Sequence, residues 1–290
     1  MLNLMKRAMK KVNFGVEIEF TGIHRREVAE TLSEYFKTNY IRTATIFEVE
    51  DDLRRKWKLV RDNSIRVEAK EEHIYGSDMY KNELVTPILN VDDIDSLKDI
   101  ISLLNEKGSI VNDSCGLHVH VGAESHEITS LKRLLIFWIN HQNIFLEYFK
   151  TNQRSREKYC KLIPLSIKEY LSTNKDITDD EFKEMWYKDY DDKPTKYNKS
   201  RYQSLNLNTL YTIGTIEFRI GRGSLDYEYI EEYIIFCILI SQKALFDEDM
   251  EQKRFTDMKE LLKYLKLDTA LNKCINHEIN KKTDIKKERK

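Results

Sequence analysis

The sequence predicts an α+β fold in which a β-sheet is backed by helices. Several short stretches alternate polar residues with β-branched, leucine or aromatic residues, which is typical of strands with one buried face. Longer stretches repeat apolar residues at helical spacing and are apolar enough to pack behind such a sheet. The 290 residues, 41% of them hydrophobic, suffice for a sizeable core in one large domain or two small ones.

The first part of the chain is expected to alternate strands with helices after a basic lead-in at 1–12. Two helices are expected where apolar residues recur at helical spacing, at 25–38 and 92–107. The second has aspartates in its first turn and a glycine at its end, as the helix dipole and helix-stop chemistry favour. Strands are expected at 13–21, 43–50, 57–60 and 82–87.

The second part of the chain is expected to be mainly helical around two further strands. Residues 154–200 show no sheet pattern and hold charge-rich helical pieces, which makes them the best candidate for a mobile lid or an inserted subdomain. Strands are expected at 114–122 and 215–220, and helices at 127–150, 226–247 and 255–275.

The charge balance and the cysteines argue against several classes of protein. Lys and Arg number 48 and Asp and Glu 49, so neither nucleic acid nor an anionic membrane is expected as a partner. The four cysteines form no CxxC pair, so neither a zinc ribbon nor a redox motif is indicated. The N-terminus is too short and polar for a signal peptide, and no apolar run reaches membrane-spanning length. We therefore expect a reducing, cytoplasmic setting.

Three of the expected strands carry two ionisable residues on one face, because residues two apart in a strand point the same way. These pairs are Glu17 with Glu19, His118 with His120, and Glu217 with Arg219. If the strands join one sheet with these faces aligned, three carboxylates, two imidazoles and an arginine gather in one place. Buried charges without partners are costly, and no cation lies near Glu17 and Glu19 in the sequence. A divalent metal ion is the simplest explanation, and this ligand set suits Mg²⁺ or Mn²⁺.

Each pair taken alone has a plainer interpretation. The two glutamates of 13–21 fit the solvent face of an edge strand, and the two histidines fit structural groups or half of a zinc or iron site. Glu217 with Arg219 fits a surface ion pair, and Arg201 and Arg222 fit surface charges. The occurrence of all the pairs in one chain favours a shared site.

Six short motifs stand in order along most of the chain. They are Phe14–Phe20 (FGVEIEF), Asp62–Ser64 (DNS), Glu83–Pro87 (ELVTP), Ser114–Gly122 (SCGLHVHVG), Arg201 with Leu205–Leu207 (LNL), and Thr215–Arg219 (TIEFR). Together they resemble the putative amidoligase family, which belongs to the carboxylate–amine ligase superfamily with glutamine synthetase and glutamate–cysteine ligase. The resemblance implies a curved antiparallel sheet of the glutamine synthetase-like kind. It makes 1–250 an amidoligase-like catalytic domain with a helical insertion at about 154–200, followed by a C-terminal helix and basic tail at 251–290.

The resemblance also implies roles for individual residues. Arg219 is implied to contact the transferring phosphoryl group, and His120 to lie near phosphate or substrate. Arg201 is similar to an arginine that contacts phosphate or a substrate carboxylate, and we add Arg222 to the nucleotide site by position alone. Glu217, Arg201 and Arg219 are thus the expected catalytic residues. The implied metal ligands are Glu17, Glu19, Asp62, Glu83, His118 and Glu217.

The activity implied by the resemblance is an ATP- and Mg²⁺-dependent (or Mn²⁺-dependent) ligation of a carboxylate to an amine, on a small molecule or a peptide. ATP converts the unreactive carboxylate to an acyl phosphate, and metals and arginines neutralise the moving phosphoryl group. Neither a GxxxxGK[ST] loop nor a GxGxxG turn is present. The alternatives are a kinase of the same fold, a nucleotide-binding protein without catalysis, and a metal hydrolase that uses His118, His120 and a carboxylate.

Overall fold

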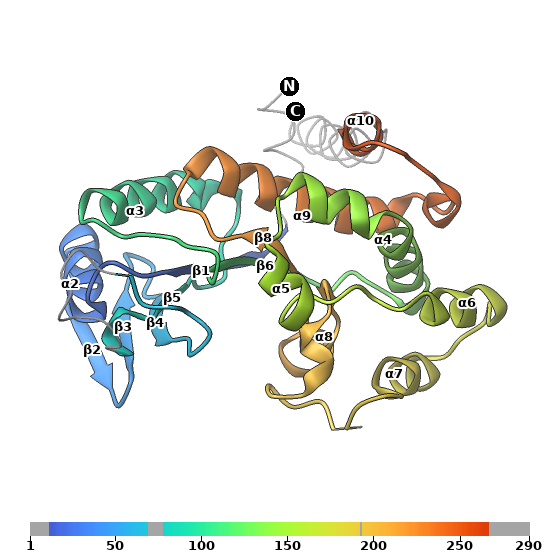
Figure 1. Cartoon of the computed structure of the whole chain (residues 1–290), viewed down its shortest axis with the longest axis horizontal. Coiled ribbons are helices and arrows are strands. Elements are labelled where there is room, and N and C mark those ends of the chain that lie inside the picture. Colours follow the sequence, from blue (N-terminus) through green and yellow to red (C-terminus); the bar gives the residue numbers. More distant parts are fainter. Residues whose placement is uncertain (1–11, 69–77, 192, 267–290) are drawn as a thin grey trace, which may run out of the picture.

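The centre of the protein is one antiparallel sheet of eight strands (Figure 1). The computed structural model describes residues 12–68, 78–191 and 193–266. The strand order is β2-β3-β4-β5-β1-β6-β8-β7, so β2 and β7 form the two edges and the sheet is open. The strands are β1 (Phe14–Phe20), β2 (Tyr40–Thr43), β3 (Ile46–Glu50), β4 (Lys56–Arg61), β5 (Asn82–Val85), β6 (Gly116–Gly122), β7 (Leu205–Asn206) and β8 (Thr215–Arg222).

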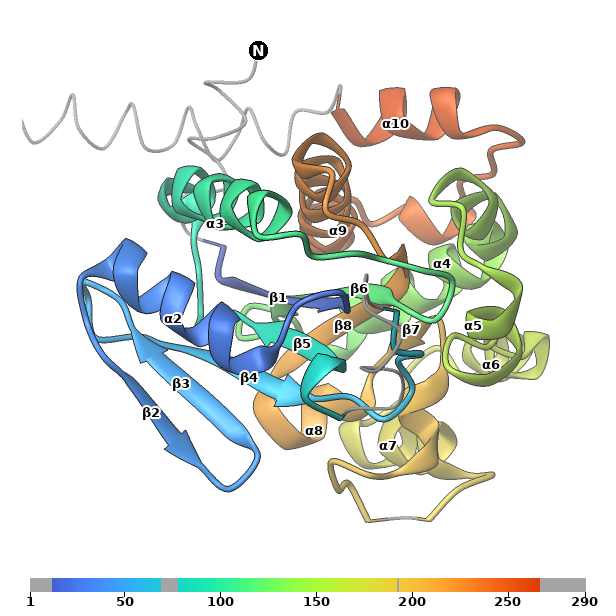
Figure 2. The ribbon, with the colours of Figure 1, turned by 60° about the vertical axis from the view of Figure 1, so that its left-hand side comes forward.

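Helices cover the sheet, and α3 and α9 lie along the same side of it in both views (Figures 1 and 2). None of the helices in the described ranges is both long and apolar enough to cross a membrane. The helices are α2 (Arg25–Phe36), α3 (Ile94–Glu106), α4 (Ile128–Tyr148), α5 (Gln153–Lys158), α6 (Leu165–Thr173), α7 (Asp179–Tyr187), α8 (Asn208–Ile213), α9 (Tyr227–Phe246) and α10 (Met258–Lys266).

One face of the sheet is a continuous apolar layer. The strand register places Phe47, Leu59, Leu84, Ile18 and Leu117 in one row across five strands. Each of these side chains is at most 1% exposed. Because side chains alternate along a strand, the residues between them point to the opposite face.

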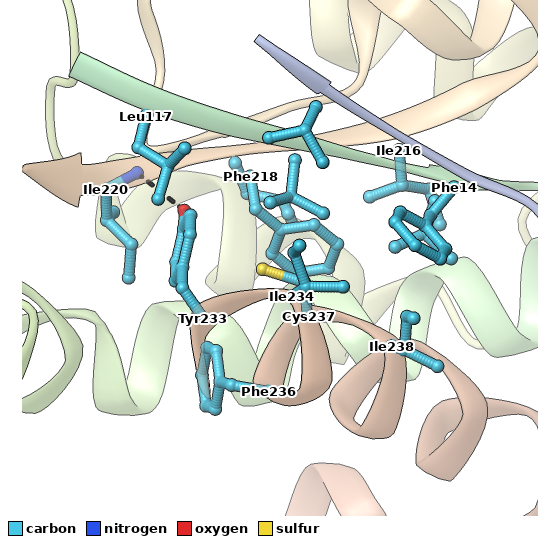
Figure 3. Packing of buried hydrophobic residues seen from close by; sticks show 14 of the residues in the cluster. Phe14, Leu117, Ile216, Phe218, Ile220, Tyr233, Ile234, Phe236, Cys237 and Ile238 are labelled. Atoms are coloured by element: carbon cyan, nitrogen blue, oxygen red, sulfur yellow. Dashed lines mark hydrogen bonds between the residues drawn. The ribbon is translucent and has the colours of Figure 1, made fainter. Parts of the chain in front are cut away.

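Helix α9 packs against this apolar face and holds β8 in place (Figure 3). Phe218 of β8 lies over Ile234 and Cys237 of the helix, and Ile220 lies beside Tyr233. The backbone N–H of Ile220 also donates a hydrogen bond to the hydroxyl of Tyr233, at 3.1 Å. The polar face of β8 is therefore turned away from α9.

The predicted α+β class and the helix-backed antiparallel sheet are confirmed, whereas the glutamine synthetase-like curvature stays a prediction. The strand predicted at 43–50 is confirmed as the shorter β3, but the prediction missed β2, which precedes it and pairs with it as a hairpin. Their turn contains Ala44 with a φ of 48°. The three helices α5 to α7 occupy the predicted helical region, but its role as a lid or insertion stays a prediction. The basic lead-in (apart from residue 12) and the tail from 267 lie outside the described residues.

Candidate active site

The structure brings the three ionisable pairs together on the polar face of the sheet. Strands β1, β6 and β8 are neighbours, with β5 on the other side of β1. The residues that face one another across the strands are Glu17 with His118, His120 with Glu217, and Glu19 with Glu83. Asp62 follows directly after β4 and joins the group from there.

Two glutamates lie between the two imidazoles. His118 Nδ1 is 3.0 Å from Glu17 Oε2 and 3.7 Å from Glu217 Oε1. His120 Nε2 is 3.4 Å from Glu17 Oε1 and 3.8 Å from Glu217 Oε1. Although buried, His120 Nε2 has no partner with hydrogen-bond geometry in the described part of the chain. This nitrogen therefore has its lone pair or proton available for a ligand.

Among the described residues, three overlapping sets of side chains have the geometry to hold a metal ion. In each set the ligand atoms lie within 4.8 Å of one another. Glu17 and Glu83 each belong to two sets, so their carboxylates can bridge neighbouring ions. The sets are Glu17, Glu83 and His118; Glu17, His120 and Glu217; and Glu19, Asp62 and Glu83.

The electrostatics of the cluster favour an added cation. Burial, followed by the nearby charges of Glu17, Glu19 and Asp62, raises the pKa of Glu83 well above its usual value. Burial also raises the pKa of Glu19. Burial alone would raise the pKa of Glu17, but the adjacent imidazoles of His118 and His120 outweigh it and hold the pKa well below its usual value. The carboxylates thus exceed the positive charge around them, and oxygen-rich sites of this kind suit Mg²⁺ or Mn²⁺.

Arg219 supplies a buried positive charge at one side of the cluster. Its side chain forms an ion pair with Glu217, and its Nε donates to the carbonyl of Tyr159 at 3.2 Å. Only 6% of Arg219 is exposed. A planar guanidinium held in this way can bind phosphate oxygens bidentately.

The other two predicted arginines have their contacts elsewhere. Arg201 donates to the carbonyl of Lys196 at 3.0 Å, and its guanidinium lies over the ring of Tyr202. The guanidinium of Arg222 is 4.3 Å from the ring centre of Tyr229 on α9. Within the described residues neither arginine contacts the carboxylates, so their roles rest on the sequence alone.

Three residues of the site were given no role by the sequence. The side-chain amide of Asn206, which is 1% exposed, donates to Glu217 Oε2. The backbone N–H of Gly116 donates to Glu19 Oε2 at 2.6 Å, and Thr215 Oγ1 is 3.0 Å from His120 Nδ1. All three lie within the six sequence motifs, and this position in a motif could have marked them as site residues.

Gly116 also lies so close to His118 that a side chain would fit there only if its neighbours moved. A Cβ built on it would lie 3.1 Å from His118 Nε2 and 3.5 Å from the carboxylate of Glu19. Any side chain there would push the imidazole away from its present position. The glycine before the histidine pair therefore leaves room for the ring of His118.

The antiparallel sheet with its buried carboxylate cluster defines a protein with a candidate divalent-metal site and an adjacent guanidinium. A family model described as "Putative amidoligase enzyme" matches residues 10–241. The chain belongs to this family, as the six motifs predict, and the family name indicates a ligase. The comparison with curated proteins finds no match to the chain.

Proposed function

We propose that the protein is an ATP- and Mg²⁺-dependent ligase that joins a carboxylate to an amine through an acyl phosphate. The observation that carries the proposal is the set of shared carboxylates, Glu17 and Glu83, beside the buried guanidinium of Arg219. Phosphoryl transfer depends on positioning and charge neutralisation more than on covalent catalysis, and this arrangement can supply both.

The carboxylate cluster and the two histidines fit Mg²⁺ or Mn²⁺ better than a softer metal, because most of the donors are oxygens. The residues that would hold the ions are Glu17, Glu19, Asp62, Glu83, His118 and Glu217. Bound ions would supply neutralisation of the phosphate charge.

The chain's own residues have distinct parts in the proposed reaction. The γ-phosphorus of ATP forms a bond to a substrate carboxylate oxygen while its bond to the bridging oxygen breaks, and ADP leaves. Arg219 binds the equatorial phosphoryl oxygens, and Glu217 orients this guanidinium through their ion pair. The amine then forms a bond to the acyl carbon, phosphate leaves, and the nitrogen loses a proton.

The first test is calorimetric titration of ATP with and without Mg²⁺. We expect binding that requires Mg²⁺ and that weakens at least tenfold in Glu17→Gln. The matched control is Glu48→Gln, because Glu48 is a strand glutamate of the same sheet whose partners are Lys56 and Lys58. A folded wild-type protein that does not bind ATP with Mg²⁺ would refute the proposal.

A second measurement separates ligation from simple phosphoryl transfer. Pools of carboxylates and amines are incubated with ATP and Mg²⁺, and ADP, amide and hydroxylamine-trapped acyl groups are measured. Amide that appears together with ADP supports the ligase. A phosphorylated product that accumulates without amide identifies a kinase of the same fold instead.

A further inference from the structure

A pocket of about 250 Å³ opens beside the carboxylate cluster. It lies where β1 and β8 begin and where β5 and β6 end. Glu17 and His120 line this pocket and also belong to one of the candidate metal sets. A molecule in the pocket would therefore reach the cluster directly.

The charged groups around the pocket are acidic. Its described lining contains the carboxylates of Glu17 and Glu124 and the imidazole of His120, but no lysine or arginine. The carboxylate of Glu124 folds over Gly122, so closely that a Cβ on that glycine would lie 2.4 Å from Oε2. Glu124 has no ion pair with any described residue. Such a lining repels phosphates and carboxylates and attracts a cation.

The rest of the lining is apolar. Ile88, which follows β5, and Ile213, the last residue of α8, both line the pocket, and they are 70% and 65% exposed. Large aliphatic side chains exposed beside a cavity are typical of a binding site for an apolar group. The volume is below the roughly 300–1,000 Å³ usual for drug-sized ligands, so the occupant is small.

The positive group of the site is not part of the pocket lining. Arg219 does not line the pocket, and its guanidinium is held in an ion pair with Glu217. Anionic substrates are thus drawn to the Arg219 side of the cluster, and the pocket is left for the uncharged or cationic substrate.

We propose that this pocket binds the amine substrate, and that this substrate is a small primary amine carrying an apolar chain. The ammonium group lies beside the carboxylate of Glu124, which belongs to none of the candidate metal sets, and the chain extends between Ile88 and Ile213 toward solvent. The inference rests on the proposed ligase function, because it assigns one of the two substrates of that reaction. It excludes an α-amino acid whose carboxylate would enter the pocket.

The probes are n-hexylamine, hexanoate and 1-hexanol, which share a chain and differ in the head group. Their binding to the full chain is measured by ligand-observed NMR at pH 7.5 without nucleotide. We expect hexylamine to bind at least tenfold more tightly than hexanoate and severalfold more tightly than hexanol.

Variants with matched controls locate the binding. A Cβ on Gly15 meets no atom closer than 3.9 Å, so this position accepts a side chain. Gly15→Val narrows the pocket and should weaken hexylamine binding at least tenfold. Glu124→Gln and Ile88→Ser should each weaken it severalfold. Glu184→Gln on α7 and Ile41→Ser on β2 also change exposed residues, but outside the pocket, and should have no effect.

The outcomes separate this inference from the proposed function. Binding of hexanoate as tight as that of hexylamine, or hexylamine binding unchanged in Gly15→Val, Glu124→Gln and Ile88→Ser, would overturn the inference. Loss of ATP–Mg²⁺ binding in Gly15→Val would assign the pocket to the nucleotide base and would also overturn it. Amine-selective binding by a protein that does not bind ATP would leave the pocket's preference standing while refuting the ligase function.

Discussion

Arg219 allows a quantitative test of how the carboxylate cluster is held together. Arg219 and Glu217 are 6% and 3% exposed, and they form an ion pair. Arg219→Met removes the guanidinium but keeps an unbranched side chain of similar length. Because Glu217 then stays buried without this cation, we expect a loss of about 3–5 kcal/mol in the free energy of unfolding.

The assay is urea unfolding followed by circular dichroism, with EDTA present. A chain of this size has an m-value near the upper end of the ordinary range, about 3 kcal/mol per M. The expected loss therefore shifts the midpoint by roughly 1–1.7 M urea. Addition of Mn²⁺ should reduce the difference between wild type and Arg219→Met, because a bound cation also neutralises Glu217.

Two controls make this prediction refutable. Arg26→Met removes an exposed guanidinium that is paired with Glu30 on α2, and it should leave the urea midpoint nearly unchanged. Glu217→Gln combined with Arg219→Met should be more stable than Arg219→Met alone, because no buried charge is left unpaired. If Arg219→Met costs no more than Arg26→Met, the charge of Glu217 is compensated elsewhere and the reasoning is wrong.

Three further predictions concern protons and hydrogen bonds. Because burial and the nearby carboxylates raise the pKa of Glu83, Mn²⁺ competes with a proton there. Its affinity measured by calorimetry should therefore rise with pH above the range in which an ordinary carboxyl group titrates. A pH-independent affinity would contradict this. Burial lowers the pKa of His126 to about 4, with a smaller contribution from Arg133. As the pH falls below 6.5, His126 is protonated in the unfolded chain before it is protonated in the folded protein. About 3 kcal/mol in the free energy of unfolding is therefore present above pH 6.5 and lost as the pH falls toward 4. Urea unfolding of His126→Gln should lack this component, and an unchanged pH profile would refute it. Asn206→Leu removes the amide that donates to Glu217, and it should cost about 1–3 kcal/mol in the same assay without lowering the helix content.

The sequence could predict the faces of the central strands because each alternates over its full length. In β1 the buried Val16, Ile18 and Phe20 alternate with the two glutamates, and the structure has this arrangement. The order in which the strands pair could not be predicted in this way. It depends on contacts between residues such as Gly15 and His120, which are far apart in the sequence, and no local pattern records them.

The features that the sequence did not predict depend on local backbone geometry without a distinctive residue. The β2–β3 hairpin turns at Ala44, which adopts a positive φ, whereas such turns ordinarily carry Gly, Asn or Asp. Strand β7 has two residues, too few for a periodic pattern, yet it places Asn206 against Glu217. The pairing of β6 with β8 shifts register between Leu117 and Val119, close to the position of Arg219. Bulges of this kind re-aim side chains near active sites, and nothing in the sequence marks this one.

The alternation of apolar and ionisable residues along the central strands also keeps the carboxylate cluster in register. Ile18, Val119 and Phe218 lie on the three central strands, are fully buried, and each contributes about 1.5–3 kcal/mol by leaving water. A slip of one residue in any of these strands would expose such side chains and turn the ionisable residues into the α9-facing core. The repulsion between Glu17, Glu83 and their neighbours is thus opposed by packing on the other face of the same strands. Because the core fixes the register, the carboxylates stay together even before a cation neutralises them, and the metal is expected to enter a preformed site.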